Sequence, residues 1–171
     1  MMALVSTLFN IFKRLIRILF LSMTTIVRDI MRKRLETIED SASVQDAAKK
    51  LKDREVSSLI VVDINGKPQG LITERDIVTK VCTSDTFTST ITNKQIMSVP
   101  LITIDSTTTP AVAADMMLQY NVRHLLVVDS KSSEGLDKPI GIVTPLDFTK
   151  SEGYAGSDDN DTVEKLLEYY I

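Results

Sequence analysis

The sequence predicts an α+β fold made of two β-α-β-β-α units, packed through their sheets around a pseudo-two-fold axis, with extra helices at the two termini. The first observation behind this prediction is an internal repeat, since a shift of 66 residues aligns 30–63 with 96–129 without a gap. The second is a seven-residue stretch, Gly70 to Asp76, that returns as Gly141 to Asp147 with threonine and aspartate at the same places. Self-similarity at this period indicates one structural unit written twice.

Each unit is predicted to contain, in order, a strand, a helix, two further strands and a second helix. In the first unit, 24–82, these elements are expected at 35–38, from Ser43, at 59–62, at 70–72 and from Thr73. Ser43 suits a helix N-cap, and the apolar residues after it recur at helical spacing. The short β-branched run at 59–62 is typical of a buried strand. Asn65-Gly66 is a strong hairpin signal between the last two strands.

The second unit, 93–150, repeats this order. Its elements are expected at 101–104, 109–117, 125–128, 140–143 and from Thr144. Pro110 and Pro145 both fall in the first turn of an expected helix, where the missing N–H of proline costs no hydrogen bond. A longer loop, 130–140, changes the shift between the copies from 66 to 71 residues at Gly141.

Three segments lie outside the two units. Residues 83–92 hold seven Ser or Thr in ten positions and predict a linker. The tail, 151–171, begins with a polar stretch and is expected to end in a helix at 162–170. Asp161 is its expected cap, and Glu164 is placed for a capping box. The apolar residues of this helix are expected to pack on the body of the protein or on a partner.

The N-terminal segment, 1–23, is apolar but carries Lys13, Arg14 and Arg17 near its middle. Charges in the middle of a spanning helix are costly, and they interrupt the apolar run instead of preceding it as in a signal peptide. Three interpretations remain: a basic amphipathic helix on an anionic membrane surface, a helix packed on the protein itself, or translation that begins at Met23. The mass of the native protein separates the last from the other two.

Composition excludes some classes of protein. Net charge is −3 and the pI is about 5.2, so the overall charge gives no reason to expect nucleic-acid binding. A short basic run, Arg28 to Arg34, contains an aspartate and lacks aromatic residues, which is typical of a solvated helix face. The single cysteine, Cys82, excludes an internal disulfide and suits a reducing compartment, so a cytoplasmic location is expected. One Cys and one His cannot form a usual zinc site within one chain, and no metal is expected.

Size decides how the units are arranged. A three-stranded sheet with two helices, about 60 residues, is too small to bury a sufficient core alone. Pairing the two copies through their sheets buries the apolar faces of both. Two equivalent clefts are then expected between the units, each beside one strand-to-helix turn.

The chain resembles, over 24–150, a tandem pair of cystathionine-β-synthase domains, also called a Bateman module. The features that carry the resemblance are a strand ending in Val-Val-Asp, a loop, and Gly-x-apolar-Thr-x-x-Asp, all present twice in the same order. The resemblance implies a module that binds adenine nucleotides or related adenosyl compounds, such as S-adenosylmethionine, as regulatory ligands. It also implies a stand-alone regulator that signals by a change of conformation or assembly and is not an enzyme.

The resemblance implies ribose-binding pairs at Thr73 with Asp76 and at Thr144 with Asp147. A carboxylate can accept hydrogen bonds from both ribose hydroxyls, and the threonine lies beside phosphate oxygens. The adenine is expected against apolar strand residues: Ile38, Val56, Leu59, Ile104, Val122 and Leu125. Arg123 and His124 match positions of phosphate contacts, where the first unit has Ser57 and Ser58. We therefore expect the firmer phosphate grip at Thr144 and Asp147.

Other interpretations compete with this one. Thr-x-x-Asp at a helix start is also the pattern of a plain N-cap with an acidic first turn, and its recurrence is what favours a site. Catalysis finds no support, because the sequence lacks hydrolase, metalloprotease and phosphate-loop motifs and no orienting group accompanies Cys82 or His124. The alternative function is a scaffold or nucleic-acid-associated protein with vestigial sites.

A homodimer is expected from the resemblance, with an effector protein that the sequence does not identify. Its expected contacts are apolar helix residues, namely Ile77, Val78, Val81, Val112 and Met116. The sequence leaves open the orientation of the dimer and the identity of the ligand.

Overall fold

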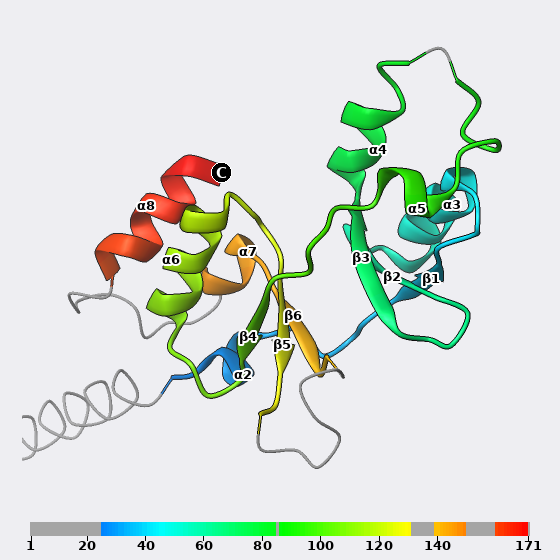
Figure 1. Cartoon of the computed structure of the whole chain (residues 1–171). Coiled ribbons are helices and arrows are strands. Elements are labelled where there is room, and N and C mark those ends of the chain that lie inside the picture. Colours follow the sequence, from blue (N-terminus) through cyan, green and yellow to red (C-terminus); the bar gives the residue numbers. More distant parts are fainter. Residues whose placement is uncertain (1–24, 85, 131–138, 150–159, 171) are drawn as a thin grey trace, which may run out of the picture.

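The structure is a computed structural model, which describes residues 25–84, 86–130, 139–149 and 160–170. It contains two three-stranded sheets, each with its own helices (Figure 1). The expected fold class is confirmed, because each sheet comes from one copy of the repeat. The expected N-terminal segment lies outside the described residues. No helix within the described ranges is both long enough and apolar enough to span a bilayer.

The first sheet has the order β1-β2-β3, with β1 and β2 parallel and β2 and β3 antiparallel. The elements of this unit are β1 (Thr37–Glu39), α3 (Val44–Arg54), β2 (Ser58–Val62), β3 (Pro68–Thr73) and α4 (Glu74–Lys80). Ser43 caps α3 as expected, since its Oγ accepts a hydrogen bond from the Asp46 N–H at 3.1 Å. Gly66, at φ 78°, occupies the left-handed region in the β2–β3 turn, as the Asn-Gly pair predicts.

The second sheet repeats this topology with the order β4-β5-β6. Its elements are β4 (Thr103–Asp105), α6 (Pro110–Tyr120), β5 (Leu125–Val128), β6 (Gly141–Val143) and α7 (Pro145–Phe148). A further helix, α8 (Asn160–Tyr170), packs against α6 and α7 (Figure 1). This helix begins at Asn160, so Asp161 lies in its first turn and is not its cap.

The two units exchange the segments that precede their first strands. The short helix α2 (Val27–Ile30) lies beside the second sheet, where Val27 donates to the Thr108 carbonyl at 2.8 Å and Val27 is fully buried in the second core. The short helix α5 (Asn93–Ile96) lies beside the first sheet, where Ile96 is buried in the first core (Figure 1). Each unit therefore completes its core with a segment whose sequence belongs to the other copy.

The glycines of the repeated stretch make this exchange possible. A Cβ at Gly70 would lie 2.7 Å from Met97 Sδ and 3.0 Å from the Ser98 carbonyl oxygen. A Cβ at Gly141 would meet Met31 Sδ and lie 3.0 Å from the Arg32 carbonyl oxygen. Both glycines thus admit the close approach of an incoming backbone and its methionine.

The sheets contact each other through one apolar layer, as expected. It consists of Ile60, Leu71, Leu126 and Ile142, with Leu35, Val62 and Leu101 around it. The predicted linker, 83–92, is partly docked instead of free, because the Val44 N–H donates to the Ile91 carbonyl at 2.9 Å and Ile91 packs on the first core. This docking gives the chain a fixed path from one unit to the other.

Candidate functional site

The first repeated motif is a reciprocal capping box at the start of α4. Asp76 Oδ2 accepts hydrogen bonds from the backbone N–H of Thr73 at 2.9 Å and from its hydroxyl at 2.6 Å. The other carboxylate oxygen, Oδ1, accepts from the Ser98 hydroxyl at 2.9 Å and from Lys80 Nζ at 2.7 Å. Burial opposes ionisation of Asp76, but the hydrogen bonds from Lys80, Thr73 and Ser98 outweigh it and hold the pKa of Asp76 below its usual value. Asp76 is therefore a carboxylate whose Oδ2 is fixed by Thr73 of the turn and whose Oδ1 is bound by the side chains of Ser98 and Lys80.

The second motif has the same box at the start of α7 but a different neighbour. Asp147 Oδ2 accepts from the Thr144 N–H at 3.0 Å and the Thr144 hydroxyl at 2.8 Å. Its Oδ1 accepts from Arg32 Nε at 2.8 Å, and Arg32 Nη2 lies 3.4 Å from Thr144 Oγ1. Burial opposes ionisation of Asp147, but the bonds from Arg32 and Thr144 lower its pKa. The side chain of Asp147 is fully buried.

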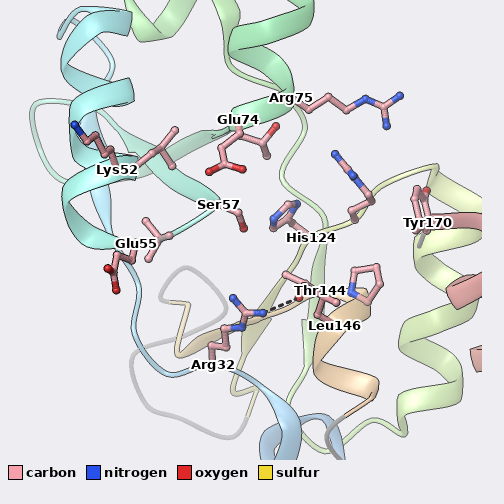
Figure 2. A pocket seen from close by; sticks show the side chains of 15 residues that line it. Arg32, Lys52, Glu55, Ser57, Glu74, Arg75, His124, Thr144, Leu146 and Tyr170 are labelled. Carbon is pink, nitrogen blue, oxygen red and sulfur yellow. Dashed lines mark hydrogen bonds between the residues drawn. The ribbon is translucent and has the colours of Figure 1, made fainter.

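A central cleft of about 730 Å³ lies between the two motifs. Figure 2 shows Glu74 and Arg75 entering it from α4, with Arg32 and His124 on other walls. The charged groups at its walls are Arg32, Lys52, Arg75, Arg123, Glu55 and Glu74. Cationic side chains outnumber carboxylates there, so the cleft favours anionic groups.

Two pockets adjoin this cleft, one at each motif. The pocket beside Thr73 and Asp76 has a volume of about 240 Å³, and we call it the first site. The pocket beside Thr144 has a volume of about 30 Å³, and we call it the second site. Every residue that lines the second site has its repeat counterpart in the lining of the first. The two sites are thus equivalent in position and unequal in volume.

The structure pairs the motifs and the basic residues the other way round from our expectation. Arg123 and His124 line the first site with Thr73 and Asp76, and Ser57 and Ser58 line the second with Thr144. We expected Arg123 and His124 at Thr144 and Asp147, but they share the smaller pocket with Thr73 and Asp76 and meet Thr144 only in the central cleft, because each site combines the motif of one unit with the β-strand entrance of the other. Of these groups, Arg123, His124 and Ser57 also reach the central cleft.

His124 stands at the junction of the first site and the cleft (Figure 2). Its Nε2 is buried and has no hydrogen-bond partner among the described residues. Burial lowers the pKa of His124 to about 4, with a further contribution from the nearby Arg123 and Arg32 charges. At neutral pH the ring is therefore uncharged, and its buried Nε2 is an unused hydrogen-bonding group in a residue that lines both cavities.

The apolar lining also differs from our expectation. Leu59, Ile104 and Leu125 are buried in the cores of their units, Ile38 packs against the first core, and these four line none of the described cavities. Successive residues of a strand point to opposite faces, so the neighbours of Leu59 and Leu125, namely Ile60 and Leu126, face the sites instead. Of the expected adenine contacts, Val122 lines the first site and Val56 lines the second.

The first site has an apolar wall and a polar end. The wall consists of Leu71, Pro100, Leu101, Ile102, Val122 and Leu126. The polar end contains Thr73, Asp76 and Ser98 from the motif and its neighbouring segment. This is the composition of a pocket for a flat apolar ring joined to a hydroxylated group. No cluster of three His, Cys, Asp or Glu suited to a metal ion occurs within the described ranges.

The family model for the CBS domain matches this chain twice, at residues 27–82 and 94–152. The chain belongs to the CBS domain family. The two matches correspond to the two units, and the exchange of α2 and α5 joins them into one CBS pair.

Proteins similar to this CBS pair include a longer chain and a separately solved CBS pair. It is 35% identical over 138 residues to the uncharacterized protein MJ1404 of Methanocaldococcus jannaschii, a match that covers 74% of this chain and 31% of that relative. The CBS pair of protein MJ0100, solved in complex with 5′-methylthioadenosine and S-adenosyl-L-methionine, is 31% identical. It superposes with a TM-score of 0.63 and covers 74% of this chain and 94% of that one.

A hexameric CBS-CP12 protein from bloom-forming cyanobacteria is 27% identical to this CBS pair. Its TM-score is 0.65, and the match covers 82% of this chain and 74% of that one. CBS pairs of this fold thus include an adenosyl-ligand complex and an oligomer.

Several residues at the sites were not singled out from the sequence. Arg32 lay in a basic run that we interpreted as a solvated face, and Ser98 and Lys80 carried no motif. The repeat could have revealed the first two, because Arg32 and Ser98 occupy the same place in the two copies. Tyr170 of α8 lines both the cleft and the first site, and its ring centroid lies 6.0 Å from Arg123 Cζ. A residue so far along the chain has no local signal of that contact.

Proposed function

We propose that this CBS pair is a regulatory module that binds an adenosine-containing ligand in the first site and signals by a change of conformation or assembly. The observation that carries the proposal is Asp76. It is a buried carboxylate whose Oδ1 faces a pocket of about 240 Å³ with an apolar wall. The adenosyl complex of the related MJ0100 pair supports the choice of ligand class.

The ribose of such a ligand is placed at Asp76. Two adjacent hydroxyls can replace the Ser98 hydroxyl and Lys80 Nζ as donors to Oδ1, while Thr73 keeps Oδ2 fixed. Lys80 is about 40% exposed and its Nζ also donates to the Ile96 carbonyl oxygen at 2.8 Å, so it can turn away from Oδ1 and keep that bond and its contact with water. The carboxylate stays ionised throughout, because its pKa is already below the usual value.

A ribose at Asp76 determines where the base and the charged end of the ligand lie. The adenine ring lies against Val122, Pro100 and Ile102, where its polar edge lies near His124, which lines the same pocket. Phosphates or another charged substituent extend into the central cleft toward Arg75, Arg123 and Lys52. His124 is neutral, so it offers the ligand a hydrogen bond and no charge.

A regulatory role fits the side chains better than catalysis does. Cys82 is exposed and lines none of the described cavities. Asp76 and Asp147 are held ionised by several donors each, which suits binding and gives neither a proton to transfer at neutral pH. The module is proposed to pass its signal to a partner protein.

Assembly is proposed to use exposed apolar residues of the helices. Val78, Val112 and Leu146 are 58%, 44% and 53% exposed, which fits the expected helix-face contact between two copies. Val81 and Ile77 face the first core instead, so they leave that contact. The hexameric CBS-CP12 relative shows that chains of this fold assemble.

Isothermal titration of ligand-free protein with AMP, ADP, ATP and S-adenosylmethionine tests the proposal. We expect saturable binding of at least one of them. Asp76→Asn should weaken it roughly 10- to 100-fold, because an amide loses charge-assisted bonds to the ribose. Asp147→Asn is the matched control and should keep the binding, with circular dichroism to confirm that both variants fold. Absence of heat from all four ligands contradicts the proposed function.

A further inference from the structure

The two sites form an internal comparison in which the incoming backbone docks in the same way and the side chain that meets the aspartate differs. The incoming segments dock alike: the Ser98 N–H donates to the Leu71 carbonyl at 2.8 Å, and the Arg32 N–H donates to the Ile142 carbonyl at 2.9 Å. The return bonds, from Leu71 and Ile142, are 3.1 and 3.0 Å. Position 98 in one copy and position 32 in the other therefore present their side chains to equivalent aspartates.

The side chains at these positions differ greatly in size and charge. The Ser98 hydroxyl touches Asp76 Oδ1 at 2.9 Å and leaves a pocket of about 240 Å³. The Arg32 guanidinium touches Asp147 Oδ1 at 2.8 Å and leaves about 30 Å³. Figure 2 shows the Arg32 guanidinium beside Thr144, with their hydrogen bond as a dashed line. Arg32 thus occupies the carboxylate oxygen that a ribose needs.

A ligand cannot displace Arg32 as easily as it displaces Lys80. The backbone of Arg32 is fixed on both sides by Ile142, and its partner Asp147 is fully buried. Removing the guanidinium leaves a buried carboxylate without its cation, which is strongly unfavourable. At Asp76 the cation comes from a lysine one helical turn away, and that lysine also donates to the Ile96 carbonyl oxygen at 2.8 Å and to the Ser98 hydroxyl oxygen at 3.1 Å, so it keeps other partners when a ligand takes its place at Oδ1.

The rest of the second site is less favourable for a nucleobase than the first, which should weaken binding there without preventing it. Where the first site has Pro100 and Ile102, the second has Arg34 and Glu36, which form an ion pair at 3.1 Å. Lys50 and Arg54 lie 3.9 and 3.8 Å from the same Glu36 carboxylate. A flat apolar ring would have to lie against these charged groups, which lose hydration when they are covered.

We infer that the residue at the paired positions 32 and 98 decides which site takes a ligand, so that Ser98 keeps the first site available and Arg32 closes the second. The inference rests on the proposed function and deepens it, since it assigns one adenosyl ligand to each chain. Arg32 acts as a built-in occupant that holds the second aspartate and the two units together.

Equilibrium dialysis with radiolabelled AMP and S-adenosylmethionine tests this by counting sites. We expect one site in the wild-type chain, lost in Asp76→Asn and kept in Asp147→Asn. Arg32→Ser should raise the count to two, and the added site should disappear in the double variant with Asp147→Asn. Ser98→Arg should remove the first site, and combining it with Arg32→Ser should move the single site to the second motif. Arg32→Gln, which keeps a hydrogen bond to Asp147, serves if Arg32→Ser fails to fold.

The outcomes separate this inference from the proposed function. A wild-type chain that binds neither probe contradicts the proposed function. A wild-type chain that binds two equivalents, one of them lost in Asp147→Asn, leaves the function intact and overturns the inference. So does an unchanged count in folded Arg32→Ser and Arg32→Gln.

Discussion

The helices that follow the first strand of each unit, α3 and α6, have the same length and opposite surroundings. Helix α3 buries Val44, Ala47 and Leu51 on one side and leaves its charged residues in solvent. Helix α6 is covered by α8 and buries a wider face than α3 does: Pro110, Ala111, Ala113, Ala114 and Met117. The two copies of the repeat have therefore taken different roles, since the second has a core reinforced by α8 and the first contributes the Thr73–Asp76 motif of the larger pocket.

The largest effect should come from breaking that reinforcement. Leu166 of α8 is fully buried in the second core, so Leu166→Ala should lower the free energy of unfolding by about 2–5 kcal/mol through lost contacts and a cavity. Urea unfolding followed by circular dichroism measures it. The control is Glu168→Ala on the exposed face of the same helix, which should change stability by less than about 0.5 kcal/mol. Equal, small effects of both changes would show that α8 is an accessory and not part of the frame.

The second effect concerns the only histidine, which has serine as its counterpart at position 58. Its folded pKa of about 4 lies below the ordinary histidine pKa of 6.5, so the unfolded chain binds the proton first as the pH falls. The stability that neutral His124 contributes is thus complete above pH 6.5 and is lost toward pH 4, by ~3 kcal/mol at most. The charged groups that bear on it are Arg123, Arg32, Asp76 and Asp147.

Unfolding at a series of pH values tests this dependence. His124→Gln should flatten the decline between pH 6.5 and 4, whereas Ser58→Ala should leave it unchanged. The depressed pKa values of Asp76 and Asp147 act in a lower window, because stability from an ionised carboxylate is lost only as the pH falls below its ordinary pKa. A decline that persists in His124→Gln would assign it to other groups.

The smallest effect concerns Gly70 and Gly141, which occupy the same place in the two copies. Gly70→Ala and Gly141→Ala should each cost about 1–3 kcal/mol, because a Cβ would press on Met97 or Met31. Adding Met97→Ala to Gly70→Ala should recover part of the loss in a double-mutant cycle. Gly66→Ala, at φ 78° with nothing near its Cβ, is the control for backbone strain alone. Clearly unequal costs for Gly70 and Gly141 would contradict the symmetric exchange.

The sequence predicted the elements better than their partners. The Ser43 cap, the Asn65-Gly66 turn and the two Thr-x-x-Asp boxes are local features, and local hydrogen bonds specify them. The sequence also predicts a strand within 58–62, but a continuous apolar run does not reveal which residues face the site. Leu59 is therefore a wrong choice of adenine contact, and its neighbour Ile60 lines the second site.

The pairing of residues across the units could not be obtained from local pattern. Arg32 and Ser98 reach the motif of the other copy because α2 and α5 cross between units, and Arg123 lines the first site because the two sheets face each other; nothing in the repeat distinguishes crossed from uncrossed docking. Arg32 looked like one of several solvated arginines, and only its position opposite Asp147 gives it a role.

The crossing of α2 and α5 also bears on how such a chain is inherited and dissected. A single copy of the unit, folded in this way, lacks a buried residue of its own core until a second copy supplies it, as Val27 and Ile96 do here. A one-unit ancestor would thus have been an obligate dimer in which each copy supplied its N-terminal helix to the core of the other. After fusion, a change written in one repeat is expressed in the other, as Arg32 of the first repeat is at Asp147 of the second. A substitution in one repeat must therefore remain compatible with the residues that it contacts in the other repeat.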